Sequence, residues 1–277
     1  MKHINIGFEL VSLVRCDKWP VKELPDILKD VADIGYDGVE FCRGLFGKTP
    51  QEISQVCKDL GLAPVSSHTE IEVMTADMDL ALKESRGLGL KYIAFPNPGK
   101  DVEYHNAREE DLVMVIDRIR KYAQIITDNG FICAQHSSSV TFETDKDGKM
   151  LIDRIMEEID PAILQIQLDS AWAMQADVDV PAYIRKYDGR LDVFHIKDFI
   201  GPMPRNPRMV DRKEATFAEK RDAAIGEGML DIPGIVKACK ETGVQWIHIE
   251  QMERVPYDVA LDFAKRSYNN LVKAMEE

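Results

Sequence analysis

Residues 163–198, ILQIQLDSAWAMQADVDVPAYIRKYDGRLDVFHIKD, contain two short apolar runs separated by a segment with helical character. The first run, ILQIQLD, closes on Asp169, and the second, LDVFHI, is followed by Lys197 and Asp198. Two strands joined through a helix are typical of a parallel β-α-β unit, because parallel strands need a crossover connection. Each strand of this unit ends in a polar side chain, and the second ends in His195.

The same alternation of strand and helix continues along the whole chain. Strands are expected at 4–10, 37–41, 62–68, 91–96, 131–136, 163–169, 191–196 and 244–250. Amphipathic helices are expected at 21–34, 49–61, 78–89, 107–129, 147–159, 179–187, 230–243 and 257–275. Eight such pairs predict an α/β fold, a single (β/α)8 barrel that occupies residues 1–277 as one domain. An open doubly wound sheet normally carries a glycine-rich phosphate loop after an early strand, which this sequence lacks.

Composition and charge narrow the function classes. Of the 277 residues, 45% are hydrophobic and 30% are charged, which is typical of a soluble globular protein. The net charge of −13 disfavours binding to nucleic acid or to an anionic membrane. The five cysteines form no CxxC pair, so neither a disulfide framework nor a zinc ribbon is indicated. The N-terminus lacks the apolar core of a signal peptide, and a cytoplasmic location is expected.

Polar residues at the expected strand ends point to a site. Active sites of such barrels lie at the carboxyl ends of the strands. Asp169, His195 and Glu250 close three consecutive strands, so their side chains are expected to converge. Two carboxylates and an imidazole suit Mn²⁺, Mg²⁺, Co²⁺ or Zn²⁺. For each residue taken alone, membership of a hydrogen-bonded polar cluster is the alternative.

The fifth strand is expected to supply the fourth metal ligand. His136 is the first candidate and Gln135 the second. The alternative for His136 is a base that contacts the substrate, and Gln135 is then a further substrate contact.

Other strand-end residues are candidates for substrate binding. Glu40 is expected to face the mouth of the barrel, where it binds a substrate hydroxyl or acts as an acid or base. His68 binds a hydroxyl or is a buried structural residue, and Trp172 forms an apolar wall or part of the core. His248 is expected to alternate with the inward-facing positions of its strand and is left out of the site.

Five stretches of the sequence resemble a known family. They are GYDGVEF at 35–41, LQIQLDSAWA at 164–173, RLDVFHIKDF at 190–199, GEGMLDIPGIVKA at 226–238 and VQWIHIEQ at 244–251. They resemble the sugar phosphate isomerase/epimerase family of the xylose-isomerase-like TIM barrel superfamily, which also includes inosose dehydratases and endonuclease IV. The resemblance covers essentially the whole chain.

The resemblance implies a divalent metal, with Mn²⁺ the first choice, held by side chains of the last four strands. Asp169, His195 of HIKD and Glu250 of IEQ match the family's ligands. Lys197 is implied to bind substrate or to act electrostatically. Asp198 is expected to orient a neighbouring group.

The fifth strand departs from the family pattern. Many members carry Tyr-His-Asn-His-x-x-Glu-Phe there, whereas this chain reads QHSSSVTF at 135–142. His136 keeps the first histidine, while Ser138 stands at the second and Thr141 at the glutamate. Isomerases and epimerases often employ two bases, and Glu250 is the one carboxylate clearly supplied here. This departure makes an elimination with a single base more credible.

The resemblance therefore implies a metal-dependent sugar isomerase or epimerase. It removes a proton next to a metal-bound carbonyl, with His136 or Glu250 as the base. The alternative is a lyase or dehydratase of a keto-sugar, inosose or related polyol with the same first step. A non-catalytic sugar-binding barrel, or a subunit of a larger complex, is a third reading. Endonuclease activity is disfavoured by the negative charge and the few well-placed histidines.

The sequence also leads to expectations about binding partners and about one long loop. The partner is a small-molecule sugar or sugar derivative, and a homo-oligomer is possible. A long loop at about 199–230, which contains Arg205, Arg208 and Arg212, is expected to cover the site.

Overall fold

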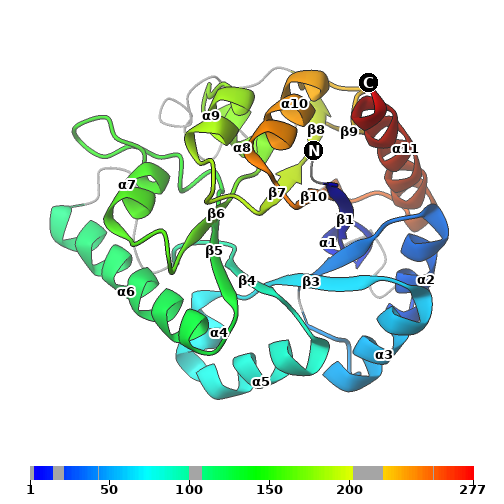
Figure 1. The fold of residues 1–277 in the computed structure, drawn as a ribbon, viewed down its shortest axis with the longest axis horizontal. Coiled ribbons are helices and arrows are strands. Elements are labelled where there is room, and N and C mark those ends of the chain that lie inside the picture. The colour runs from blue at the N-terminus through cyan, green and yellow to red at the C-terminus, as the bar shows by residue number, and fades with distance from the viewer. Residues whose placement is uncertain (1–2, 15–21, 43, 100–107, 202–220, 252) are drawn as a thin grey trace.

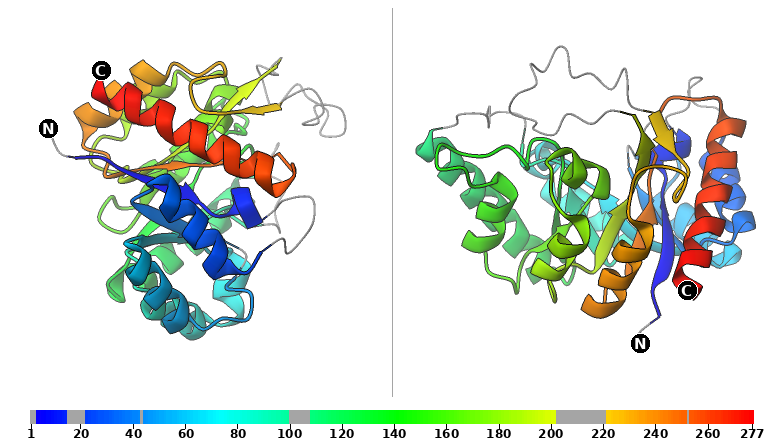
Figure 2. Two further views of the ribbon diagram at one scale, coloured as in Figure 1. Left: turned by 90° about the vertical axis from the view of Figure 1, so that its right-hand side faces the viewer. Right: turned by 90° about the horizontal axis from the view of Figure 1, so that it is seen from above.

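A parallel barrel of eight strands surrounded by helices forms the fold (Figures 1 and 2). The computed structural model describes residues 3–14, 22–42, 44–99, 108–201, 221–251 and 253–277. The barrel strands are β1 (Asn5–Glu9), β2 (Gly38–Phe41), β3 (Ala63–His68), β4 (Tyr92–Phe95), β5 (Ile132–His136), β6 (Gln165–Gln167), β7 (Val193–Ile196) and β10 (Trp246–Ile249). All eight lie within the strand ranges expected from the sequence.

Eleven helices are described, and most of them lie on the outside of the barrel. They are α1 (Val11–Val14), α2 (Leu24–Ile34), α3 (Pro50–Leu60), α4 (Ile71–Ala76), α5 (Met78–Leu88), α6 (Glu109–Asp128), α7 (Leu151–Glu158), α8 (Ser170–Gln175), α9 (Val180–Lys186), α10 (Ile232–Thr242) and α11 (Tyr257–Glu276). The short helices α1, α4 and α8 were not expected from the sequence. No helix in the described residues is long and apolar enough to cross a membrane.

The sheet closes between its two end strands. Its order is β6-β5-β4-β3-β2-β1-β10-β7, so β6 and β7 are the ends. An isolated parallel bridge joins Asp169 to His195, and the His195 N–H donates to the carbonyl of Leu168 at 2.8 Å. The structure is therefore a nearly closed TIM barrel, and the predicted fold class is confirmed.

The interior of the barrel changes from apolar to polar along its axis. Ala63, Tyr92, Ile132, Val193 and Trp246, which are the first residues of their strands, pack with Val65 in a small cluster separate from the main core. Buried polar side chains occupy the levels toward the carboxyl ends of the strands. In the described part of the chain, the buried polar groups of the interior therefore gather at the carboxyl end of the barrel, where the active sites of TIM barrels lie.

The segment after β7 begins and ends in an antiparallel ribbon. Strand β8 (Asp198–Ile200) pairs with β9 (Arg221–Ala223). The expected cover over the site, with Arg205, Arg208 and Arg212, lies outside the described residues.

Asp198 fixes the loop between β9 and α10. Its buried carboxylate accepts five backbone N–H groups, those of Phe199, Gly226, Gly228, Met229 and Leu230, at 2.8–3.1 Å. A Cβ on Gly228 would lie 2.2 Å from Asp198 Oδ1, so the carboxylate leaves no room for a side chain there. The sequence predicted that Asp198 orients a neighbouring group of the site, whereas the hydrogen bonds of its carboxylate are with this loop.

Candidate metal and substrate site

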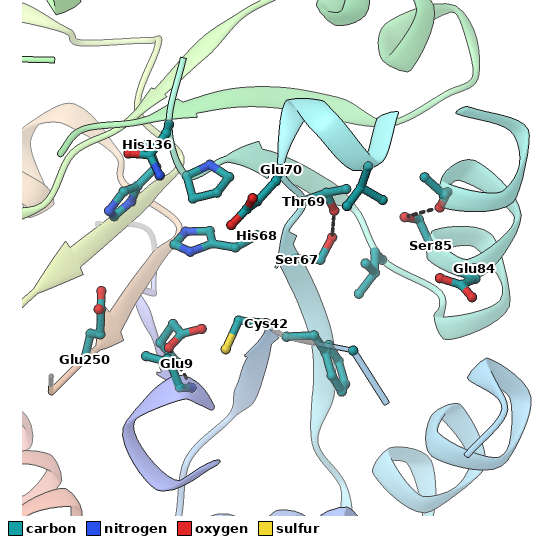
Figure 3. Close-up of a pocket in the computed structure, with 18 of the residues that line it drawn as sticks. Glu9, Cys42, Ser67, His68, Thr69, Glu70, Glu84, Ser85, His136 and Glu250 are labelled. Atoms are coloured by element: carbon teal, nitrogen blue, oxygen red, sulfur yellow. Dashed lines mark hydrogen bonds between the residues drawn. The ribbon is translucent and has the colours of Figure 1, made fainter. Parts of the chain in front are cut away.

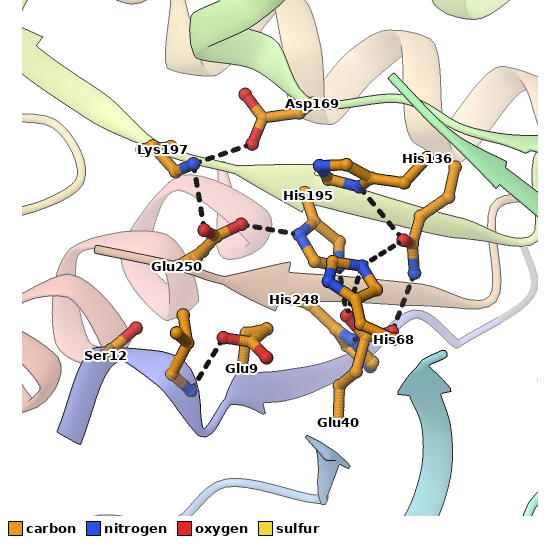
Figure 4. Close-up of polar contacts among 12 residues, drawn as sticks. Glu9, Ser12, Glu40, His68, His136, Asp169, His195, Lys197, His248 and Glu250 are labelled. Carbon is orange, nitrogen blue, oxygen red and sulfur yellow. Dashed lines mark hydrogen bonds and ion pairs between the residues drawn. The ribbon is translucent and has the colours of Figure 1, made fainter. Parts of the chain in front are cut away.

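Four buried side chains converge at the carboxyl ends of the last four barrel strands (Figure 4). His136 ends β5, Asp169 follows β6, His195 lies in β7 and Glu250 follows β10. Each offers one ligand atom, and these four atoms lie within 4.8 Å of one another. The sequence predicted this set of four residues as metal ligands.

The four side chains suit a divalent metal. A metal that holds nitrogen and oxygen ligands at about 2.0–2.2 Å keeps them within about 4.4 Å of one another, which small side-chain movements would reach from the observed spacing. Two imidazoles and two carboxylates form a donor set that zinc, manganese and cobalt accept. All four residues are buried, so water competes little for the donor atoms.

Lys197 joins the two carboxylates of this cluster. Its Nζ lies 3.0 Å from Asp169 Oδ2 and 3.0 Å from Glu250 Oε1, and its side chain is 2% exposed. Burial opposes the charge on Lys197, but the two carboxylates outweigh burial and raise its pKa. Burial also opposes the charge of Glu250, yet Lys197 and His195 hold the pKa of Glu250 well below its usual value. Trp172 lies beside Lys197, with its ring centroid 5.5 Å from Nζ.

A second layer of buried polar groups holds the two histidines. Glu40 Oε1 lies 2.8 Å from His195 Nε2, and Gln167 Oε1 lies 3.0 Å from His136 Nδ1. The amide nitrogen of Gln167 donates to Glu40 Oε2 at 2.7 Å, so its oxygen is the acceptor for His136. His136 therefore carries its proton on Nδ1, which leaves the Nε2 lone pair available to bind a metal or a proton.

His195 lies between two carboxylates. Its Nδ1 is 2.9 Å from Glu250 Oε2, on the side opposite Glu40. Burial lowers its pKa, but the charges and hydrogen bonds of Glu40 and Glu250 outweigh burial and raise the pKa of His195 to about 10. A metal ion that binds at Nδ1 displaces the proton there. His136 has carboxylates at a greater distance, and burial together with His68 and His195 holds its pKa well below the usual value.

Glu40 lies deeper than the sequence suggested. It was expected to face the mouth, but it is fully buried and is not among the residues that line the cavity. Strand β2 continues to Phe41, so Glu40 lies within the strand and points into the barrel. Its carboxylate contacts Ser66, Gln167, His68 and His195. Burial opposes the charge of Glu40, but His68 and His195 hold its pKa well below the usual value.

Gln135 lies away from the cluster. Side chains alternate along a strand, so the neighbour of inward-facing His136 faces the other way. The Gln135 amide donates to the carbonyls of Phe95 and His136 at 3.1 and 3.0 Å, and the side chain is not among those lining the cavity. His68 does line the cavity, with its Nε2 2.8 Å from Gln167 Oε1, and so does Trp172.

Two interior residues were not predicted to belong to the site, although each lies two positions before a predicted ligand in the sequence. His248 precedes Glu250 by two, so both face inward, and the expectation that it alternates with inward positions was wrong. Its ring is fully buried 3.8 Å from Glu40, and burial lowers its pKa to about 3. A Cβ on Gly7 would lie 2.1 Å from this ring. Gln167 precedes Asp169 by two and links Glu40 to His136.

Glu9 at the end of β1 also belongs to the site. It lines the cavity and is fully buried, and its Oε2 accepts the Val11 N–H at 2.7 Å. Burial raises its pKa well above the usual value, and the charges of Glu250 and Glu40 raise it further. Glu9 is therefore a neutral acid under conditions where an exposed glutamate is ionised.

A cavity of about 640 Å³ opens over this cluster (Figure 3). Glu9, His68, His136, Lys197 and Glu250 line one end of it. Pockets of about 300–1,000 Å³ are typical of small-molecule sites. Of the four predicted ligands, His136 and Glu250 thus line a space large enough for a substrate, and Asp169 and His195 are fully buried beside them.

The fold and this buried cluster define a TIM barrel with a polar site, suited to a divalent metal, at the carboxyl ends of its strands. The chain belongs to the xylose isomerase-like TIM barrel family, whose family model matches residues 28–267. The family resemblance noted from the sequence is confirmed.

Individual relatives are distant. An inosose dehydratase of Geobacillus kaustophilus is 24% identical over 230 residues, which cover 75% of this chain and 70% of that protein. A crystal structure of a sugar phosphate isomerase/epimerase from Parabacteroides distasonis superimposes with a TM-score of 0.77 at 18% identity over 98% of each chain. The IolI protein, solved with a zinc atom, gives a TM-score of 0.73 at 13% identity over 99% of this chain and 98% of its own. These structural likenesses support the fold.

Proposed function

We propose that this protein is a divalent-metal-dependent enzyme that removes a proton from the carbon next to a carbonyl group of a sugar or sugar derivative. The observation that carries the proposal is that one ligand atom each of His136, Asp169, His195 and Glu250 converge within 4.8 Å, with His136 and Glu250 at the wall of a cavity. Distant relatives named as an isomerase/epimerase and as a dehydratase support the substrate class.

Asp169, His195 and Glu250 are the residues that hold the metal, with His136 as the fourth ligand or the base. A bound metal supplies a Lewis acid that polarises a carbonyl and stabilises the negative charge of the enediolate. His136 Nε2 accepts either a metal or a proton, because Gln167 holds the ring proton on Nδ1. When His136 is a ligand, Glu250 is the base. Metal content of His136→Ala separates the two roles, since only a ligand's loss lowers it.

The ammonium of Lys197 is the group that stabilises charge on the substrate. It lines the cavity, where its three N–H bonds, two of which face Asp169 and Glu250 when no metal is bound, can reach a substrate oxygen. His68 and Trp172 line the same cavity and are assigned to substrate binding. Glu40 is assigned to holding His195, and Gln135 has no direct contact with the cavity.

Return of the proton to the substrate gives isomerisation or epimerisation, which is the proposed outcome. Elimination is the second candidate, and the fifth strand favours it. Thr141, at the position of the family's glutamate, is fully buried, and its hydroxyl donates to the Ser138 carbonyl. This position therefore brings no second base to the cavity. Glu9 offers a neutral carboxyl that can protonate a leaving group.

Solvent exchange tests the proposal. Enzyme loaded with Mn²⁺ is incubated in D₂O with a panel of keto-sugars and inososes, and the products are examined by NMR. The expected result is deuterium at a carbon next to the carbonyl, and its loss in Asp169→Asn. The product distinguishes isomerisation or epimerisation from elimination. Absence of exchange and turnover across the panel would contradict the proposal and favour a non-catalytic sugar-binding barrel or a subunit of a complex.

A further inference from the structure

The cavity extends well beyond the strand-end cluster. Figure 3 shows His136, Glu9 and Glu250 at one end and Ser85 and Glu84 at the other. Between β3, α4 and α5 the wall becomes apolar. We call this part the side pocket, and it is lined by Phe41, Leu45, Val73, Ala81, Leu88 and Leu90.

The side pocket offers mainly carbon surface. Its polar neighbours are Ser67 and Thr69, whose hydroxyls bond each other at 3.1 Å, and Glu84, which is exposed. Phe41, Ala81, Leu88 and Leu90 are 4–7% exposed, so their side chains form a fixed wall. The hydroxyl of Ser85 donates to the Ala81 carbonyl within α5 at 2.8 Å, so that donor is already used. A sugar hydroxyl placed against this wall would lose hydrogen bonds to water without replacement, which is unfavourable. An aliphatic or aromatic group placed there would gain from leaving water.

The two parts of the cavity suit different parts of one ligand, a polar part at the strand ends and an apolar part in the side pocket. The polar end carries the groups that bind a carbonyl and hydroxyls, and the side pocket is continuous with it. A single ligand that fills the cavity therefore has a polar sugar part joined to an apolar part. The total of about 640 Å³ lies in the range of sites for drug-sized ligands.

We propose that the side pocket binds an apolar substituent carried by the sugar, so that the substrate class is a sugar with an aliphatic or aromatic group attached, such as a glycoside whose sugar ring also carries a keto group. This inference rests on the proposed function, which places the sugar at the strand-end cluster. The side pocket then determines specificity, because a free sugar leaves it unfilled.

Matched glycosides test the inference by calorimetry, without any need for turnover. The probes are methyl and phenyl glycosides of glucose, galactose, xylose and ribose, titrated into Mn²⁺-loaded protein. For at least one sugar the phenyl form is expected to bind about 10- to 100-fold more tightly than the methyl form. Val73→Asp, at a side chain that is 52% exposed and tolerant of charge, should remove most of this gain. Val113→Asp, on α6 at 42% exposed, is the matched control and should retain it.

A second variant tests the side pocket independently, and the binding results have distinct consequences. Ala81→Phe fills the side pocket and should also remove the difference in affinity between phenyl and methyl glycosides. Equal affinity of methyl and phenyl forms for every sugar, no binding of any phenyl glycoside, or a gain that survives both variants would overturn the inference. A gain that depends on Val73 without deuterium exchange would keep the side pocket and reject the enzyme proposal. Deuterium exchange on free sugars, together with no preference for phenyl glycosides, would support the enzyme proposal and reject the side pocket.

Discussion

Glu40 Oε1 lies 2.8 Å from His195 Nε2, and both side chains are fully buried inside the barrel. Glu40 does not itself line the cavity, yet it fixes the ring of a predicted metal ligand. Ligating histidines commonly donate their second ring N–H to a carboxylate, which sets the tautomer and strengthens the ligand. The buried polar residues beneath the site, such as Glu40, therefore contribute to its function because they position a predicted ligand.

Replacement of Glu40 by glutamine should weaken metal binding. The Gln167 amide donates to one carboxylate oxygen, and the other lies 2.8 Å from His195 Nε2, so the amide introduced by Glu40→Gln would set its NH₂ group against one of these two nitrogens. We expect the affinity for Mn²⁺ to fall about 10- to 100-fold, measured by calorimetry. Ser66→Ala removes a hydroxyl from the same carboxylate without touching His195 and serves as control. Unchanged affinity in Glu40→Gln would show that Glu40 does not position the ligand.

Lys197 and a divalent cation compete for the same two carboxylates. In Lys197→Met the pair Asp169 and Glu250 loses its buried counter-ion, which should lower stability without metal by about 3–5 kcal/mol. Added Mn²⁺ should restore much of that stability and bind more tightly than in wild type. Urea unfolding with and without Mn²⁺ measures both effects, with exposed Lys237→Met as control. Equal metal-induced stabilisation in wild type and Lys197→Met would contradict the competition.

Glu9 should make stability depend on pH. Its pKa is raised above 4.5, so below pH 4.5 the folded and the unfolded chain both hold the proton. Above that pH the unfolded chain releases the proton while the folded chain keeps it, so wild-type stability falls as pH rises toward the folded pKa. Glu9→Gln removes this loss. The stability of Glu9→Gln minus that of wild type, from urea unfolding of metal-free protein, should grow with pH above 4.5, and a constant difference would reject a neutral Glu9.

Asp198 should stabilise the loop before α10 more than any single exposed charge does. Asp198→Ala leaves five backbone N–H groups without their acceptor, which should cost about 3 kcal/mol or more. Asp198→Asn keeps one acceptor oxygen and should cost less. Thermal unfolding gives the order, and hydrogen exchange should speed up at 226–230. Protection of these amides at the wild-type level in Asp198→Ala would contradict the assignment.

The polar residues at the strand ends could be predicted from the sequence. How deep an interior side chain lies in the barrel could not. Apolar runs closed by Asp169, His195 and Glu250 gave the barrel and the converging ligands, because alternation and run length are local properties. His248 was within reach by counting two back from Glu250. The depth of Glu40 depends on how far β2 extends and on its shifted register with β3 between Val39 and Glu40, which only the assembled sheet determines.

The most direct test of the account is the metal content of purified protein after saturation with Mn²⁺ and removal of excess ion. Wild type and the exposed control Asp188→Asn should retain a stoichiometric divalent ion. Asp169→Asn and Glu250→Gln should lose it while circular dichroism shows an intact barrel. Stoichiometric metal in both site variants would contradict the claim that the strand-end cluster is a metal centre.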